Sequence, residues 1–169
     1  MISDERVEER GGVPYAAIRT TVSMDGFGDQ LGPMWDEVFG WLGERGIAPA
    51  GAPIIRYRVI DMERQLAIDV GVPTAEPVDG DGRVVGDILP GGRYAVLLYR
   101  GHYDGLVNAN AALQAWATER GLAIDQRTTA DGDAFGGRIE SYLTDPVESP
   151  DPATWETEVA YRLADSGTA

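Results

Sequence analysis

The 169-residue sequence contains no cysteine, no lysine and only one histidine, His102. Without cysteine the chain forms no disulfide and offers no thiolate nucleophile or thiolate metal ligand. A single histidine does not make a metal site alone, and no spaced set of histidine and carboxylate ligands accompanies it. The GxSxG motif of serine hydrolases is also missing. We therefore expect neither a metal nor another cofactor.

The chain also lacks a long apolar segment. No run approaches the ~18 residues that a membrane-spanning helix needs, and the charged start MISDERVEER does not resemble a signal peptide. We therefore predict a soluble, cytoplasmic protein with no membrane partner. The 14 basic residues are all arginines and face 28 acidic ones, which gives a net charge of −14. Such a surface attracts cations and repels phosphate backbones, so we expect no direct nucleic-acid partner.

An internal repeat is the main feature that the sequence does contain. Four short segments recur in the same order, with displacements between 75 and 89 residues. Four matches in order indicate a tandem duplication with loops of unequal length. The matches are PYAAIRT at 14–20 with RYAVLLY at 93–99, WLGERG at 41–46 with WATERG at 116–121, YRVID at 57–61 with SYLTD at 141–145, and IDVGVP at 68–73 with TEVAYR at 157–162.

Each copy is predicted to fold as strand, helix, strand, strand. Runs rich in β-branched and aromatic residues alternate with two segments of helical periodicity, and Gly46 and Gly121 are predicted to end the helices. We expect helices over about 28–45 and 104–121, with a hairpin after each and short additional strands at 6–10 and 83–89.

These patterns predict an α+β fold with a single domain over residues 1–169. Its two βαββ halves, 8–73 and 83–165, are expected to pair about an approximate two-fold axis. The result would be an antiparallel sheet with both helices on one face. We expect a concave ligand groove between the halves on the other face, because sites commonly form at such junctions.

The segment RIESYLTD at 138–145 alternates like a strand but carries a carboxylate at its centre. Arg138, Glu140 and Tyr142 lie on one side, and Ile139, Ser141 and Leu143 on the other. The first side faces either water or a binding pocket. The alternation alone leaves both possibilities open.

The ordered repeat resembles the GyrI-like small-molecule-binding domain family, which also supplies effector domains to drug-sensing transcription regulators. The likeness covers about residues 8–165 and is carried by GHYDGLVNANAALQAW at 101–116, ESYLTDP at 140–146 and WETEVAYRL at 155–163. His102 is a departure, since relatives often have proline before the tyrosine. The resemblance implies a groove for flat, often cationic, aromatic compounds, with a glutamate inside it and aromatic side chains around it.

Glu140 is the best match for the central glutamate, with Arg138 and Tyr142 on the same strand face. Glu158 is the competing candidate, because it lines the groove if its side of the last strand faces inward. Aromatic residues near the expected rim are further candidate ligand contacts: Tyr103, Trp155 and Trp35.

Three functions fit such a groove. The first is binding of planar, preferably cationic, aromatic molecules by a stand-alone monomer or homodimer, for sensing or sequestration. The second is hydrolysis of cyclopropane-bearing genotoxins, as reported for some stand-alone members of the family, with Glu140 as catalytic acid or base. The third is a protein-interaction module. If Glu140 is a buried, uncompensated charge, its change to glutamine should leave stability unchanged or higher.

Overall fold

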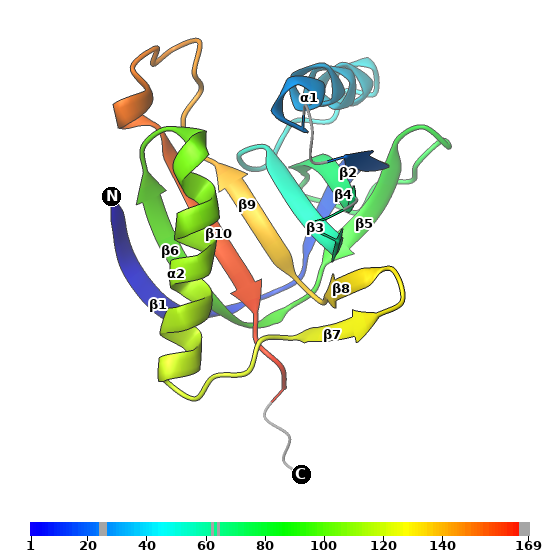
Figure 1. Ribbon diagram of the computed structural model, residues 1–169. Helices are drawn as coiled ribbons and strands as arrows, with labels where there is room; N and C mark the ends of the chain where they lie inside the picture. The colour runs from blue at the N-terminus through cyan, green and yellow to red at the C-terminus, as the bar shows by residue number, and fades with distance from the viewer. Residues whose placement is uncertain (24–26, 62, 64, 166–169) are drawn as a thin grey trace.

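The computed structural model describes residues 1–23, 27–61, 63 and 65–165. It has an α+β fold in which ten antiparallel strands form one curled sheet, shaped like half a barrel, with two helices (Figure 1). Among these residues, no helix has both the length and the apolar character that a bilayer crossing requires. The helices are α1 (Phe27–Glu44) and α2 (Leu106–Glu119); the strands are β1 (Ile2–Arg10), β2 (Val13–Ser23), β3 (Ile54–Asp61), β4 (Gln65–Pro73), β5 (Val85–Leu89), β6 (Gly92–Arg100), β7 (Gln126–Thr129), β8 (Gly132–Phe135), β9 (Arg138–Tyr142) and β10 (Glu156–Arg162).

The strand order is symmetric about the central pair β3 and β9. Across the sheet it runs β1-β6-β10-β9-β3-β4-β2-β5, so β4, β2 and β5 correspond to β10, β6 and β1. The first strand of each copy pairs with the other copy: β1 with β6, and β5 with β2. This exchange and the central β3–β9 pair join the copies into one sheet. The short strands expected at 6–10 and 83–89 are therefore present, as the edge strands β1 and β5, while the boundaries 8–73 and 83–165 stay a prediction.

The strand registers relate the two copies residue by residue. The match of 68–73 with 157–162 agrees with the way β4 pairs with β2 and β10 pairs with β6. The same registers make Tyr57 the counterpart of Tyr142. The sequence match of Tyr57 with Ser141 was wrong by one residue, and this difference matters for the site.

The two helices end in the same way. Gly46 and Gly121 follow them with φ angles of 67° and 70°, the left-handed conformation that glycine adopts without strain. Trp41 and Trp116 occupy equivalent positions, and in each case the arginine four residues later stacks over the ring, at 3.9 and 4.3 Å from its centre. The equivalence predicted from WLGERG and WATERG is therefore seen in the local structure.

Both faces of the sheet carry buried residues. One face packs against the helices through Ile55, Val70, Leu97 and Val159, among others, and α2 contributes Leu113 to the same cluster. The opposite face has its own cluster, which includes Tyr15, Ile54, Tyr94 and Ile139. The hairpin β7–β8 was not predicted; its first strand is mostly exposed and polar, and its second extends the sheet beside the end of β3.

Candidate functional site

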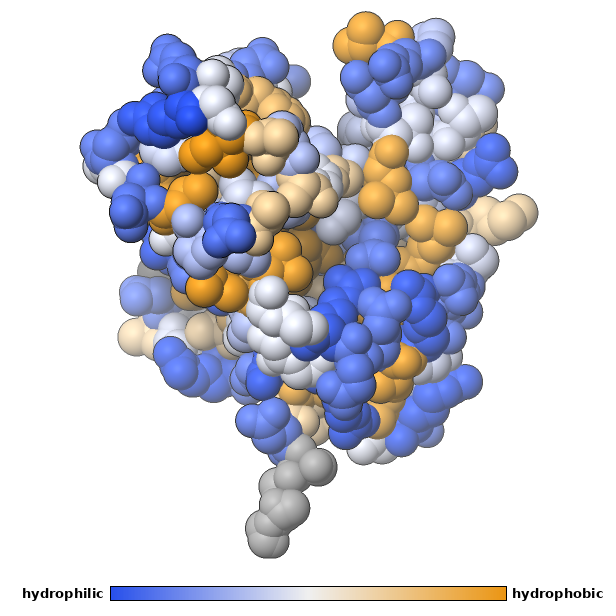
Figure 2. All heavy atoms as spheres, turned by 180° about the vertical axis from the view of Figure 1, so that it is seen from behind, coloured by the Kyte–Doolittle hydropathy of each residue, from blue (hydrophilic) through white to orange (hydrophobic). Residues whose placement is uncertain are grey.

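A groove opens between α1 and α2, on the helix-bearing face of the sheet. It has a volume of about 1700 Å³, and its walls come from both helices, the inner strands β3 and β9, and the β7–β8 hairpin. Seen from behind, a notch separates the lobe that carries α1 from the lobe that carries the loop before β10 (Figure 2). We expected the groove on the face opposite to the helices, and this prediction was wrong. Because α1 packs on β2 and β4 while α2 packs on β6, β1 and β10, the inner strands stay uncovered between them.

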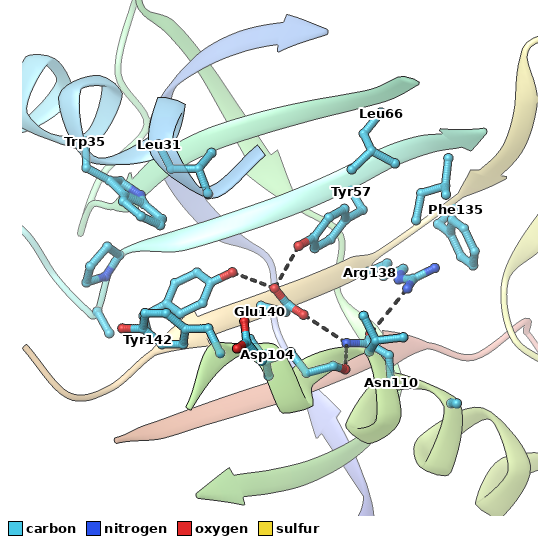
Figure 3. Close-up of a pocket in the computed structure, with 18 of the residues that line it drawn as sticks. Leu31, Trp35, Tyr57, Leu66, Asp104, Asn110, Phe135, Arg138, Glu140 and Tyr142 are labelled. Carbon is cyan, nitrogen blue, oxygen red and sulfur yellow. Dashed lines mark hydrogen bonds between the residues drawn. The ribbon is translucent and has the colours of Figure 1, made fainter. Parts of the chain in front are cut away.

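Glu140 lies on the floor of this groove and is only 4% exposed. Its Oε1 accepts hydrogen bonds from the hydroxyls of Tyr57, at 2.7 Å, and Tyr142, at 2.5 Å (Figure 3). Its Oε2 accepts a third from Asn110 Nδ2 at 2.9 Å. Three converging donors suit an ionised carboxylate, which only accepts. Among the residues that the structure describes, Glu140 forms no ion pair.

The position of Glu140 follows from the duplication. It faces Ile55 across the β3–β9 pair, at the centre of the symmetric strand order. Tyr57 and Tyr142 are counterparts, and they reach the same oxygen atom from β3 and β9 respectively. Since the counterpart of the glutamate is an isoleucine, the repeat supplies two donors for one carboxylate.

Asn110, which is 7% exposed on α2, connects the carboxylate to its surroundings. Its Nδ2 also donates to the backbone oxygen of Leu106 at 2.8 Å. Its Oδ1 accepts from the hydroxyl of Tyr161 at 2.7 Å and from Arg138 Nη2 at 3.4 Å. These contacts fix which end of the amide faces Glu140.

Aromatic rings form a continuous row along one side of the groove. Tyr142 contacts Trp35 edge-on at 5.2 Å and Tyr103 at 5.7 Å between ring centres. Tyr103 in turn lies against Trp155 at 4.7 Å. The indole N–H of Trp35 donates to two backbone oxygens, those of Ile54 and Gly71, each at 3.2 Å, which holds the ring in place.

Five of the seven candidate residues line the groove: Glu140, Tyr142, Arg138, Tyr103 and Trp35. Trp155 supports Tyr103 and stacks with His102, but it does not line the groove. Glu158 lies on the opposite face of the sheet, because Val159 is the residue that pairs with Glu140 and neighbours along a strand alternate. There it accepts a hydrogen bond from Arg10 at 2.8 Å.

Two polar residues of the site were missed in the sequence. Tyr57 was not recognised as a site residue because the sequence match of the inner strands was shifted by one residue. Asn110 lies inside the apolar stripe of α2, between Leu106 and Leu113, both of which are buried. A polar residue at such a position is a signal that would have identified it.

The tyrosine hydroxyls of the site stay protonated and so remain hydrogen-bond donors. Burial raises the pKa of both Tyr57 and Tyr142 well above the usual tyrosine value, and the charge of Glu140 adds to this effect. Burial also raises the pKa of Tyr161 to about 12. The three hydroxyls are therefore protonated at neutral pH. Within the described ranges, no group of three histidine or acidic side chains is arranged to hold a metal ion.

The family model of the GyrI-like small molecule binding domain matches residues 5–164. The chain belongs to this family. As a GyrI-like domain it is a small-molecule-binding domain. A search of curated proteins finds no match.

Solved structures share the GyrI-like fold at low sequence identity. The EcmrR C-terminal domain superposes with a TM-score of 0.72 at 15% identity, over 95% of this chain and 97% of that one. In the EcmrR–DNA complex the match covers 95% of this chain and 57% of the longer EcmrR chain, at 16% identity and a TM-score of 0.72. SAV2435 bound to tetraphenylphosphonium has a TM-score of 0.58 at 10% identity, over 96% and 95% of the chains. A hydrolase from Listeria innocua has a TM-score of 0.63 at 14% identity, over 95% and 91%.

Proposed function

We propose that this GyrI-like domain binds aromatic, preferably planar and cationic, small molecules in the groove, with Glu140 as the central carboxylate. Such binding would serve to sense or sequester toxic compounds. The observation that carries the proposal is a buried carboxylate that has three hydrogen-bond donors but no cation partner among the described residues. A ligand cation would supply the missing charge in a site where water screens little.

The walls of the groove favour the same class of ligand. Among the described residues that line it, carboxylates outnumber guanidiniums by six to one: Asp36, Asp61, Asp104, Asp133, Asp145 and Glu140 against Arg138. Rings such as Trp35 and Tyr103 offer stacking and cation–π contacts, worth roughly 0.5–2 kcal/mol each. Four exposed apolar side chains also line it: Phe39, Val107, Leu143 and Val147. Neither the charge nor the apolar surface requires one ligand shape, so broad selectivity would follow.

The SAV2435 structure supports the charge preference, since its ligand, tetraphenylphosphonium, is an aromatic cation. The test uses tetraphenylphosphonium and the anion tetraphenylborate, which have the same shape, together with the planar cation ethidium. Isothermal titration at physiological salt should give micromolar binding of both cations and much weaker binding of the anion. Equal or tighter binding of tetraphenylborate would contradict the proposal.

Glu140→Gln is the matched variant for this experiment. We expect cation affinity to fall by about tenfold, or ~1.4 kcal/mol, because charge-assisted contacts are about twice as strong as neutral ones. Glu158→Gln removes the same charge from the opposite face of the sheet and should leave affinity almost unchanged. An equal loss in both variants would indicate a general field effect and would remove Glu140 from the site.

A hydrolase is the second candidate, favoured by the likeness to the Listeria innocua hydrolase and by the phenol–carboxylate cluster around Glu140. In that case Glu140 would act as acid or base in opening a strained ring. Incubation with a cyclopropane-bearing genotoxin, followed by mass spectrometry, distinguishes the two. Ring-opened product with the wild type but not with Glu140→Gln would support hydrolysis, whereas binding without product would support the first function.

A further inference from the structure

Arg138 brings a guanidinium into the groove, and few of its N–H donors have a hydrogen-bond acceptor among the described residues. Among the described residues, its side chain makes one hydrogen bond, the 3.4 Å contact from Nη2 to Asn110 Oδ1, and no ion pair. Its Nε is buried and has no hydrogen-bond partner. Arginine stays charged at any physiological pH, so this is a fixed positive charge with unused donors. Unmet donors of a partly buried cation are costly unless another group meets them.

Aromatic rings hold this side chain in position. The guanidinium carbon lies 4.8 Å from the ring centres of Phe135 and Tyr161 and 5.4 Å from that of Tyr57. Cation–π contacts of this kind orient the planar group without using its N–H donors. Arg138 is therefore already in place for an acceptor that enters the groove.

Glu140 does not serve as that acceptor. The two residues are two apart on the same face of β9, which separates their backbones by about 6.6 Å. The carboxylate oxygens are taken by Tyr57, Tyr142 and Asn110, and the amide of Asn110 lies between the two charges (Figure 3). The floor of the groove thus presents a negative and a positive charge side by side, and Tyr57 is a neighbour of both.

We propose that Arg138 is a specificity-determining residue, and that the preferred ligands carry a carboxylate or similar anionic acceptor beside their aromatic cation. The cationic ring system would lie against Glu140, Tyr142 and Trp35, and the acceptor would bind the guanidinium. This inference rests on the proposed function and narrows its ligand class to zwitterions. For a simple cation, the same arginine acts as a repulsive charge.

Two rhodamine dyes test the inference, because rhodamine 123 is the methyl ester of rhodamine 110. They share one cationic xanthene ring system and differ in a free carboxylate, so at pH 7.5 one is a zwitterion and the other a cation. Fluorescence anisotropy gives both dissociation constants. We expect the wild type to prefer the zwitterion, and Arg138→Met to reduce that preference about tenfold. In this variant the ester should bind at least as tightly as before, since a like charge is gone.

Two further variants complete the design. Arg138→Lys keeps the charge and should retain part of the preference, whereas Arg127→Met removes an exposed arginine of β7 and should leave it unchanged. Thermal unfolding checks that each variant is folded. If Arg138→Met binds both dyes but keeps the wild-type preference, the inference is overturned while the proposed function stands. If neither dye binds the wild type, both are overturned.

Discussion

Replacing Glu140 by glutamine keeps the shape of the side chain but turns one acceptor into a donor. The new oxygen can still accept from Tyr57 and Tyr142, and the new amide nitrogen then faces Asn110 Nδ2, which now lies 2.9 Å from the carboxylate. Asn110 cannot turn over to resolve this contact, because its oxygen would then face the backbone oxygen of Leu106, now 2.8 Å from Nδ2. One buried N–H is therefore left without an acceptor.

The magnitude follows from that unmet donor. A buried polar group without a partner costs about 1–3 kcal/mol, and the removal of a buried charge offsets part of this. We expect the free energy of unfolding of Glu140→Gln to fall by about 1–2 kcal/mol at pH 7. The sequence alone suggested no loss or a gain, because it did not show that three donors already satisfy the carboxylate.

Urea unfolding followed by tryptophan fluorescence measures the change, as a lower midpoint with an unchanged slope. Glu158→Gln is the control: the Glu158 side chain is 23% exposed and is paired with Arg10 at 2.8 Å. Partly exposed pairs of this kind contribute about 0–1 kcal/mol. A Glu140→Gln protein as stable as the wild type, or more stable, would refute the hydrogen-bond pattern described at the site.

Three other perturbations have clear expected outcomes. Asp69 is fully buried, and burial alone would raise its pKa. Hydrogen bonds from arginine and tyrosine side chains lower the pKa instead. The ionised Asp69 therefore stabilises the folded protein above about pH 4, and this contribution is lost as the pH falls through the folded-state pKa. The urea midpoint of the wild type should therefore drop more steeply between pH 5 and 3 than that of Asp69→Asn; equal slopes would contradict this. Tyr57, Tyr142 and Tyr161 have raised pKa values, so their contribution to stability is complete below pH 10 and is lost as the pH rises past the folded-state values; absorbance at 295 nm should show fewer phenolates at pH 11 in the folded protein than in urea. Gly71→Ala would place a Cβ 2.8 Å from a backbone oxygen of β2 and should lower the free energy of unfolding by about 1–3 kcal/mol. Gly40→Ala, on an exposed stretch of α1 with nothing within 4 Å, should stabilise the protein. The urea midpoints of the two variants must therefore move in opposite directions.

The sequence by itself determined the class of fold and the content of one strand face. The alternation of RIESYLTD places Arg138, Glu140 and Tyr142 together, because a strand has a strict period of two wherever it lies. The repeated WLGERG and WATERG predicted equivalent helix ends, because the tryptophan–arginine stack and the glycine that follows are local interactions. The absences of cysteine and of further histidines were also visible at once.

Only the tertiary structure decided what surrounds these residues. Whether Glu158 shares a face with Glu140 depends on the pairing of β9 with β10, and the role of Tyr57 depends on a register that differs by one residue from the sequence match. The groove lies between the helices because α1 packs on β2 and β4 while α2 packs on β6, β1 and β10, and these contacts join side chains far apart in the chain. Local periodicity fixes which residues share a face. Long-range packing and hydrogen bonding decide which faces meet, and in this protein they bring Tyr57 and Asn110 to Glu140 from β3 and α2.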